Sequence, residues 1–216
     1  MTAYFVTATG TDIGKTFVTA GLIRHLRATG CAVAALKPIV SGFDDVARSD
    51  TGVLLDALGE SATADAVQRL SPWRFAAPLS PDMAAAREGR AIDVAALIAF
   101  CRAARDPGTL FVEGVGGIMV PLDATHTVLD WAAALRWPLI LVAGSYLGTL
   151  SHTLTALSVI AAAKLDVAAL VVNESAGASV PLGETVATLR RFAPGVPIAA
   201  LRRGEPDFAP LAAALA

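Results

Sequence analysis

The first seventeen residues, MTAYFVTATGTDIGKTF, constrain the fold more than any other part of the chain. Tyr4–Thr7 is a β-branched and aromatic run of the kind found in buried strands, and a glycine-bearing loop ending in Gly14-Lys15-Thr16 follows it. An apolar, helix-like segment, residues 17–26, comes directly after that loop. A strand, a glycine loop, Gly-Lys-Thr and a helix, in this order, are the context of a phosphate-binding loop.

The residues of this loop have the chemistry that phosphate binding requires. Backbone N–H groups at the helix start and the positive end of the helix dipole attract phosphate. Lys15 would place a positive charge near the β- and γ-phosphates, and the Thr16 hydroxyl would be a ligand for Mg²⁺. The loop is irregular because Thr9 stands where the common pattern has glycine. The alternative is an ordinary strand-to-helix turn, which the flanking strand and helix disfavour. The sequence therefore predicts use of a nucleoside triphosphate.

Composition limits the class of protein. With 55% hydrophobic and 17% charged residues, the 216-residue chain is not disordered, and no linker or repeat divides it, so we expect one domain over residues 1–216. A net charge of −2 without a basic cluster disfavours nucleic acid as a partner. No apolar run reaches the roughly 18 residues of a membrane span, and the N-terminus lacks a signal-peptide layout. Cys31 and Cys101 form neither a disulfide framework nor a metal spacing. We expect a cytoplasmic protein.

Short apolar segments alternate with helix-like segments along the chain. The expected strands are Thr2–Thr7, Ala32–Lys37, Leu110–Val112, Leu139–Ala143, Ala168–Val172 and Pro197–Leu201. The expected helices are Thr16–Thr29, Thr51–Leu58, Ile92–Ala104, Thr149–Lys164 and Leu182–Phe192. The strands are continuous apolar runs, as in sheets covered by helices on both faces. The pattern predicts an α/β fold with a doubly wound, mostly parallel sheet, in which ligands bind at the carboxyl ends of the strands.

The residues after the second expected strand are candidates for such a site. Lys37 stands at the strand end, where it is either a solvated terminus or a second cation that stabilises a transferring phosphoryl group. Ser41 adds a hydroxyl group beside Gly42. Asp50, after Ser49, stands near the start of the next helix and is either part of its cap or a Mg²⁺ ligand.

Three later strand ends carry further candidates. Glu113 ends a buried strand and is followed by a glycine-rich segment, so it is a candidate Mg²⁺ ligand beside the phosphate loop. Thr149 and Ser151 lie at a helix start that either is simply capped or binds a carboxylate. Asn173 has the donors and acceptors that suit a base edge, although asparagine also commonly ends strands.

Taken together, these segments resemble the dethiobiotin synthetase family nearly from end to end. The matching segments are Tyr4-Phe5-Val6-Thr7, Thr11, Gly14-Lys15-Thr16, Lys37-Pro38 with Ser41-Gly42, Ser49-Asp50, Phe75–Pro81, Glu88-Gly89-Arg90, Val112-Glu113-Gly114 with Gly116-Gly117, Leu147-Gly148 with His152, and Asn173. The resemblance implies a P-loop NTPase fold and a ligase of biotin biosynthesis. Its substrates would be 7,8-diaminononanoate (7,8-diaminopelargonate), CO₂ and MgATP, and the reaction would pass through a carbamate and a carbamic–phosphoric anhydride to dethiobiotin, ADP and phosphate.

The resemblance also implies roles for particular residues. The catalytic residues would be Lys15, Lys37, Thr11 and Ser41, and ATP would be bound by Asp12, Ile13, Gly14, Lys15, Thr16, Phe17 and Asn173. The Mg²⁺ ligands would be Thr16, Asp50 and Glu113. The substrate would be bound by Thr11, Lys37, Ser41, Ser80 and Gly116, together with Gly148, Thr149 and Ser151 of a neighbouring subunit. The last three imply a homodimer with active sites at its interface.

The chain departs from the family at a few positions, and other classes of protein remain as alternatives. Ala8, Asp12 and Asp82 replace residues usual in the family, and Arg202-Arg203 stand where a segment near the adenine is expected. A switch ATPase of the ParA/MinD group would carry a lysine early in the loop, but residues 8–13 contain none. The cobyrinic acid amidating enzymes carry a glutamine-hydrolysing domain for which this chain has no room. An inactive nucleotide-binding module would not need a second lysine and an acidic residue.

Overall fold

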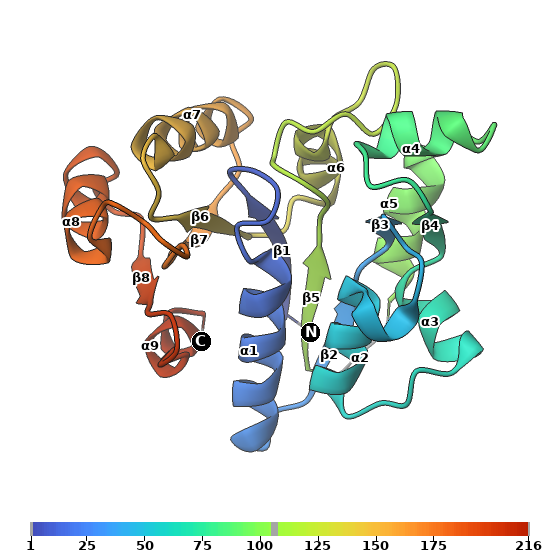
Figure 1. Ribbon diagram of the computed structural model, residues 1–216, viewed down its shortest axis with the longest axis horizontal. Coiled ribbons are helices and arrows are strands. Elements are labelled where there is room, and N and C mark those ends of the chain that lie inside the picture. The colour runs from blue at the N-terminus through green and yellow to red at the C-terminus, as the bar shows by residue number, and fades with distance from the viewer. Residues whose placement is uncertain (1, 105–107, 216) are drawn as a thin grey trace.

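The computed structural model describes residues 2–104 and 108–215; the remaining residues of the expected domain lie outside the described part. The main sheet has the strand order β2-β5-β1-β6-β7-β8, and every neighbouring pair is parallel (Figure 1). Its strands are β1 (Thr2–Ala8), β2 (Val33–Leu36), β5 (Thr109–Glu113), β6 (Leu139–Gly144), β7 (Val167–Asn173) and β8 (Ile198–Leu201). The mostly parallel sheet predicted from the apolar runs is therefore confirmed.

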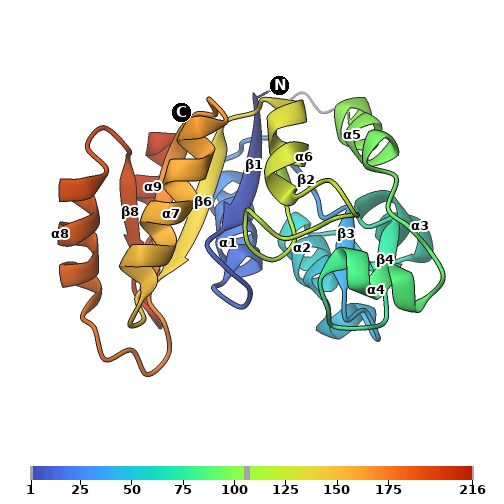
Figure 2. The ribbon, with the colours of Figure 1, turned by 90° about the horizontal axis from the view of Figure 1, so that it is seen from above.

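Helices cover both faces of this sheet, as Figure 2 shows. On one face pack α1 (Lys15–Ala28), α2 (Asp50–Leu58), α3 (Ala64–Leu70) and α9 (Ala209–Ala214). On the other face pack α4 (Pro81–Arg87), α5 (Val94–Ala103), α6 (Val128–Leu135), α7 (Thr149–Ala162) and α8 (Leu182–Phe192). This two-sided cover confirms the doubly wound α/β fold. No helix of the described residues combines the length and apolar character needed to cross a membrane.

Strand β1 shows why the apolar runs are continuous. Successive side chains of a strand point to opposite faces, so a strand covered on both faces needs apolar residues at every position. Phe5 packs in the hydrophobic core on one face of the sheet, where its ring lies edge-on to the Trp131 ring with 4.8 Å between the ring centres. Tyr4 and Val6 pack in the core on the other face. All these side chains are buried. The central position of β1 then places the loop that follows it in the middle of the carboxyl edge.

Several elements are missing from the sequence prediction. Strands β3 (Ile39–Ser41) and β4 (Trp73–Phe75) form a separate two-stranded parallel sheet. Each has three residues, too short for a periodic pattern, and they come together only in the tertiary structure. Helices α3, α4, α6 and α9 were also not predicted, although α6 carries a recognisable capping box between Thr127 and Asp130. A 3₁₀ turn, Val46–Arg48, precedes α2.

Strand register brings three segments together at the carboxyl edge. Glu113 at the end of β5 lies beside Val6 of β1, and Leu36 of β2 lies beside Val112 of β5. The loop after β1, Lys37 after β2 and Glu113 therefore meet on one edge of the sheet. This is the edge at which open α/β folds bind ligands.

Candidate active site

The loop between β1 and α1 has the backbone shape of a phosphate cradle. Gly14 precedes α1 with a φ of 98°, a left-handed conformation that only glycine adopts without strain. Asp12, with a φ of 57°, is a residue type that tolerates this region. Thr9, which stands where the common pattern has glycine, donates its amide to Val142 O at 3.0 Å. Thr9 therefore extends the hydrogen bonding between β1 and β6 into the start of the loop. The predicted loop thus forms despite the missing glycine.

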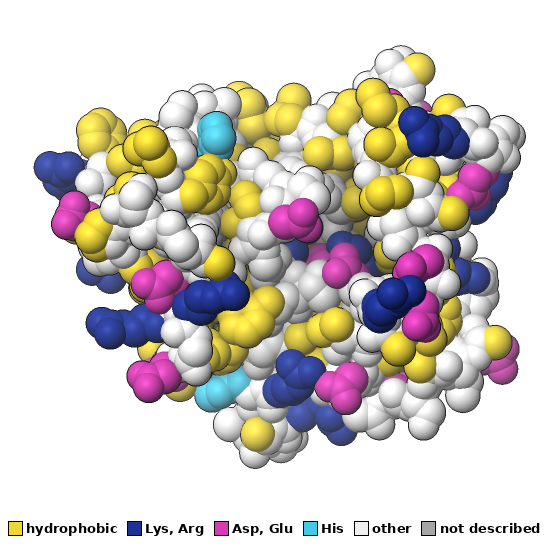
Figure 3. Space-filling model, viewed as in Figure 1, with side chains coloured by type: hydrophobic (Ala, Val, Ile, Leu, Met, Phe, Trp, Pro, Cys, Tyr) yellow, Lys and Arg dark blue, Asp and Glu magenta, His cyan; other side chains and the backbone are white. Residues whose placement is uncertain are grey.

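A cavity of about 640 Å³ opens beside this loop. The predicted site residues that line it are Thr11, Asp12, Gly14, Lys15, Thr16, Lys37, Ser41, Asp50, Ser80 and Gly116. Figure 3 shows the recess near the centre of the molecule, with charged side chains of both signs at its floor. The prediction omitted Arg48, Pro78, Leu79 and Val120, which also line the cavity. Pro78 and Leu79 belong to a matching sequence segment, but only the tertiary structure turns that segment toward the loop.

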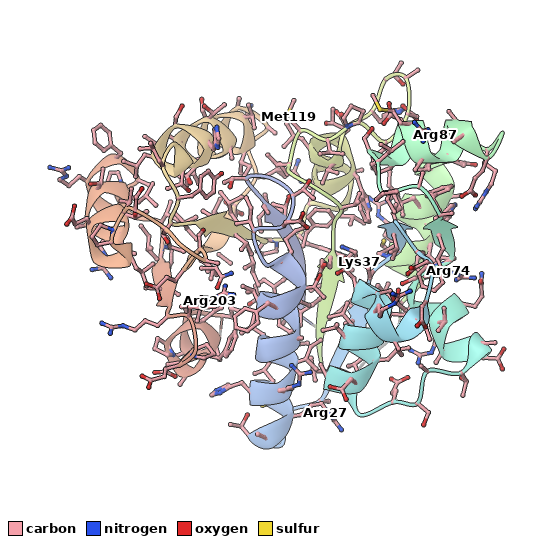
Figure 4. The ribbon with its side chains drawn as sticks, viewed as in Figure 1. Arg27, Lys37, Arg74, Arg87, Met119 and Arg203 are labelled. Carbon is pink, nitrogen blue, oxygen red and sulfur yellow. The ribbon has the colours of Figure 1, made fainter. Side chains whose placement is uncertain are left out.

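Lys37 is the centre of a buried charge cluster (Figure 4). Its ammonium group lies 2.7 Å from Glu113 Oε1 and 3.1 Å from Asp50 Oδ2, and it donates to Gly114 O at 2.8 Å. The side chains of Lys37 and Glu113 are 3% and 0% exposed. Burying a charge is costly unless the charge is paired and hydrogen-bonded. The three contacts pair the Lys37 ammonium group with opposite charges and satisfy its hydrogen-bond donors. The alternative that Lys37 is a solvated strand terminus is therefore wrong.

The charges in the cavity follow from these contacts. Burial lowers the pKa of Lys37, but the carboxylates of Glu113 and Asp50 outweigh it and raise this pKa above its ordinary value. Burial raises the pKa of Asp50, yet Lys37 lowers it below the usual range. Lys37 and Asp50 are therefore both charged at neutral pH.

Lys15 has a different environment. Burial, and then the positive charge of Lys37, lower the pKa of Lys15 to about 8. Its ammonium group lies 3.4 Å from Gly10 O, inside the loop, and no carboxylate of the described residues forms a hydrogen bond or an ion pair with it. The chain has three lysines, and two of them line this cavity while Lys164 does not. Of these two lysines, Lys15 is therefore the one whose charge a bound phosphate would stabilise more.

The oxygen atoms near Lys37 fit a magnesium ion. Thr16 Oγ1 donates to Glu113 Oε1 at 2.6 Å, and Glu113 Oε2 is buried without a hydrogen-bond partner in the described chain. A hydroxyl and two carboxylates are the hard donors that Mg²⁺ prefers, and water and phosphate usually complete its shell. The described residues contain no cluster of three or more His, Cys, Asp or Glu side chains that could hold a metal alone. The donor set therefore suits a magnesium–nucleotide complex.

Asn173 contacts the phosphate loop itself. Its side-chain Nδ2 donates to Ile13 O at 2.9 Å. A Cβ atom at Gly14 would lie 2.4 Å from the same nitrogen, so the amide group packs directly against the loop. Phe17 lies in the first turn of α1 and is 45% exposed, with its ring 5.9 Å from that of Phe208. The structure brings Asn173 to the loop, whereas its predicted contact with adenine stays a prediction.

The predicted residues at the start of α7 do not line the cavity of their own chain. Thr149 is buried and its hydroxyl donates to Gly144 O at 2.8 Å. Gly148 and Ser151 are exposed. Leu147 beside them is 82% exposed, the largest value among the exposed large hydrophobic residues of the described chain.

Comparison with known proteins identifies the family. A family model described as an AAA domain matches residues 2–202. The ATP-dependent dethiobiotin synthetase of Acidiphilium cryptum is 49% identical over 213 residues, covering 96% of each chain. That of a Caulobacter species is 51% identical over 211 residues, covering 95% of this chain and 90% of the relative. The chain is an AAA-domain protein of the dethiobiotin synthetase family. The resemblance seen in the sequence is confirmed.

Solved structures share the overall fold of this dethiobiotin synthetase family member. The cell division ATPase MinD of Pyrococcus furiosus aligns with a TM-score of 0.54 and 16% identity, covering 93% of this chain and 83% of the other. The hydrogenase maturation factor HypB of Archaeoglobus fulgidus aligns with a TM-score of 0.56 and 12% identity, covering 95% and 84%. At these identities the likeness shows the fold alone.

Proposed function

We propose that the chain converts 7,8-diaminononanoate, CO₂ and ATP into dethiobiotin, ADP and phosphate, as an ATP-dependent ligase of biotin biosynthesis. The observation that carries this proposal is that Lys15, at the end of the phosphate loop, and Lys37, after β2, line the same cavity. Membership of the dethiobiotin synthetase family supports it, because the relatives are named for this activity.

The reaction we propose has three steps. One amine of the substrate forms a bond to the carbon of CO₂ and loses a proton, which gives a carbamate. A carbamate oxygen then attacks the γ-phosphorus of ATP, so that ADP leaves and a carbamic–phosphoric anhydride forms. The second amine attacks the carbonyl carbon and loses a proton, which closes the ureido ring and expels phosphate. Negative charge develops on the carbamate, on the transferring phosphoryl group and on the departing phosphate, and cations in the cavity would stabilise it.

The two lysines supply those cations from different segments of the chain. Lys15, held in the loop, would neutralise the β- and γ-phosphates. Lys37, held by Glu113 and Asp50, would approach the carbamate and the transferring phosphoryl group. Because the carboxylates fix the position of Lys37, its charge needs little rearrangement during reaction. Positioning and electrostatic stabilisation are the main contributions of proteins to phosphoryl transfer.

Hydroxyl groups on the cavity wall would orient the substrate. The hydroxyls of Ser41 and Ser80 are buried and have no hydrogen-bond partner among the described residues. A buried hydroxyl without a partner is unfavourable, so both are suited to a polar ligand. Thr11 and Gly116 line the same cavity. We assign to these four residues the binding of the diamine and its carbamate, which removes orientational freedom before reaction.

Nucleotide and metal binding complete the proposed site. Asp12, Ile13, Gly14, Thr16 and Phe17 would surround the phosphates with the loop and the first turn of α1. Thr16, Asp50 and Glu113 would hold Mg²⁺. When bound, this ion would neutralise part of the negative charge of the triphosphate. We keep Asn173 as a proposed contact to adenine, through the carbonyl oxygen that its contact with Ile13 leaves free.

We further propose that the chain is a homodimer, with one domain over residues 1–216, and that it works in the cytoplasm without nucleic acid or membrane partners. The start of α7, with Gly148, Thr149 and Ser151, would bind the substrate carboxylate of the neighbouring subunit. Its absence from the cavity of its own chain supports this arrangement, as does the exposed Leu147.

The decisive experiment measures phosphate release with MgATP and bicarbonate, with and without 7,8-diaminononanoate, while dethiobiotin is followed by mass. We expect release that depends on the diamine and equals the product formed. Lys37→Gln should lower kcat by about 10²-fold or more, as loss of a charge-stabilising group does. Lys164→Gln, the same change at the lysine outside the cavity, should leave kcat unchanged. Hydrolysis indifferent to the diamine would instead indicate a switch ATPase.

A further inference from the structure

The segment Glu88-Gly89-Arg90 matches the family but does not line the cavity. It follows α4, and Gly89 adopts a φ of 64° that turns the chain back. The amides of Gly89 and Arg90 donate to Ala86 O at 3.1 Å and to Ala85 O at 2.9 Å. The turn therefore directs the side chains after α4 toward the small sheet, against which α4 lies in Figure 2.

Both charged side chains of this turn bind backbone groups in β4 or directly after it. The Ala76 amide donates to Glu88 Oε1 at 2.8 Å. Arg90 Nη1 donates to Arg74 O at 3.0 Å and to Glu88 Oε2 at 2.9 Å. The Arg90 guanidinium group also lies 4.6 Å from the centre of the buried Phe75 ring. These contacts form a clip, defined as Glu88 and Arg90, on residues 74–76.

The clipped segment carries one wall of the cavity. Phe75 pairs with Ser41 across the small sheet, and Phe75 O accepts from the Phe43 amide at 2.9 Å. Ala77 O accepts from the Gly42 amide at 3.0 Å. Residues 78–81 follow directly and line the cavity, as do Ser41 and Gly42. Ser41, which pairs with β4, and Ser80, which follows β4 in the chain, therefore lie on adjacent segments.

This wall has little support of its own. An isolated pair of strands is only marginally stable, and β3 and β4 have three residues each. The two strands belong to a sheet separate from the main one. Contacts from outside must therefore hold them, and the clip provides charge-assisted hydrogen bonds, which are stronger than neutral ones.

We propose that Glu88 and Arg90 are positioning residues that hold the Ser41 and Ser80 wall in place for the diamine without touching it. Neither residue lines the cavity. The inference rests on the proposed function, since it assigns this wall to the diamine rather than to ATP. The wall and the phosphate loop are different segments, so changes in the clip should separate the binding of the two substrates.

Steady-state kinetics test this separation. Glu88→Ala and Arg90→Ala should each raise the KM for the diamine about tenfold, because small displacements of positioning groups have large kinetic effects. The KM for MgATP should change less than about twofold, because the phosphate loop stays intact. Glu88→Gln keeps an acceptor for the Ala76 amide and should recover part of the diamine affinity. Equal changes in both KM values, or no recovery with Gln, would overturn the proposal.

A matched control distinguishes positioning from general stability. Glu60 and Arg69 form another partly exposed ion pair, which does not line the cavity. Glu60→Ala and Arg69→Ala should leave the KM for the diamine unchanged. If the clip variants lower the melting temperature as the control variants do and likewise leave the KM unchanged, Glu88 and Arg90 are only structural.

Hydrogen exchange tests the clip without substrate or turnover. In Glu88→Ala the amides of Gly42 and Phe43 should exchange about tenfold faster, while those of α1 keep the wild-type rate. Unchanged exchange at Gly42 and Phe43 would contradict the proposal even if the enzyme is active. If the wild-type protein shows no diamine-dependent phosphate release, the proposed function fails instead, and the exchange rates still decide whether the clip holds the wall.

Discussion

Lys15 and Lys37 lie in the same cavity, yet their surroundings give them different properties. Lys37 is in contact with two carboxylates, which keep it protonated, whereas the hydrogen-bond partner of Lys15 among the described residues is a loop carbonyl. The pKa of Lys15, lowered by burial and then by Lys37, is about 8. The charge that attracts the phosphates is therefore the one that titrates first as the pH rises.

The first prediction concerns this titration. Protonated Lys15 binds triphosphate better than neutral Lys15, so the Kd for MgATP should rise as the pH increases through about 8. Isothermal titration calorimetry between about pH 7 and 9.5 measures this Kd. The pH range lies above the reference pKa of histidine, so a histidine with that pKa is mostly neutral throughout. Lys15→Ala should bind weakly with no such rise. A wild-type Kd that stays constant over this range would contradict the lowered pKa.

The second prediction concerns Asn173. Its hydrogen bond to Ile13 O supports the loop, so Asn173→Ala should weaken binding of Mg²⁺–tripolyphosphate, which has no base, about fivefold, as expected for a loss of about 1 kcal/mol. Loss of ATP affinity with unchanged tripolyphosphate affinity would assign Asn173 to the base alone. Comparing Kd values for ATP and GTP in the same variant measures any contribution to base selectivity.

At the level of elements, α1 connects the phosphate loop to the C-terminal segment. A Cβ atom at Gly21 would lie 1.9 Å from Cζ of Phe208, the residue before α9. The Phe208 ring therefore occupies the space that a side chain at Gly21 would fill. Tyr4 on β1 also donates to Leu215 O at 2.5 Å, just after α9. The packing of α9 thus depends on the absence of a side chain in the middle of α1.

The third prediction follows from this contact. Alanine is a better helix former than glycine by about 1 kcal/mol, but Gly21→Ala would force Phe208 away, and overpacking costs about 1–3 kcal/mol. We expect the substitution to lower the melting temperature. In a Phe208→Ala background the same substitution should raise it, because the helix propensity then acts alone. The same sign in both backgrounds would show that the Phe208 contact is not the cause.

At the level of the whole molecule, the cavity and the start of α7 are separate surfaces of one chain. The proposed homodimer would combine them, since each site would use the loop of one subunit and the helix start of its neighbour. Two inactive variants with defects in different surfaces should then complement each other. Oligomers with two-fold symmetry make this a quantitative test.

The fourth prediction is subunit complementation. Lys15→Met removes the loop cation, and Ser151→Asp places a carboxylate where the substrate carboxylate would bind. Co-expressed in equal amounts, the two should form mixed dimers with one intact site, and the mixture should recover about a quarter of wild-type activity. Activity no greater than the mean of the two separate variants would argue against a shared site. Ser151→Ala, which adds no charge, is the matched control and should retain activity alone.

Prediction from the sequence succeeded where the pattern is local. The apolar runs of the main strands indicated the covered parallel sheet, and Gly14-Lys15-Thr16 between a strand and a helix indicated the loop. The residues after the strands come together in the structure because parallel strands all end at the same edge of the sheet. The clearest failure was the small sheet, whose strands are separated by more than thirty residues and are too short to have a period.

The chain by itself determined its fold class, its phosphate loop and its family, because each depends on residue types in a fixed local order. Only the tertiary structure decided how the charges are paired. Burial of Lys37 between Glu113 and Asp50 arises from three segments that are distant in sequence. The tertiary structure likewise placed Asn173 against the loop and Glu88 against the Ala76 amide, directly after β4. These contacts depend on distances across the fold, which no local pattern of residues contains.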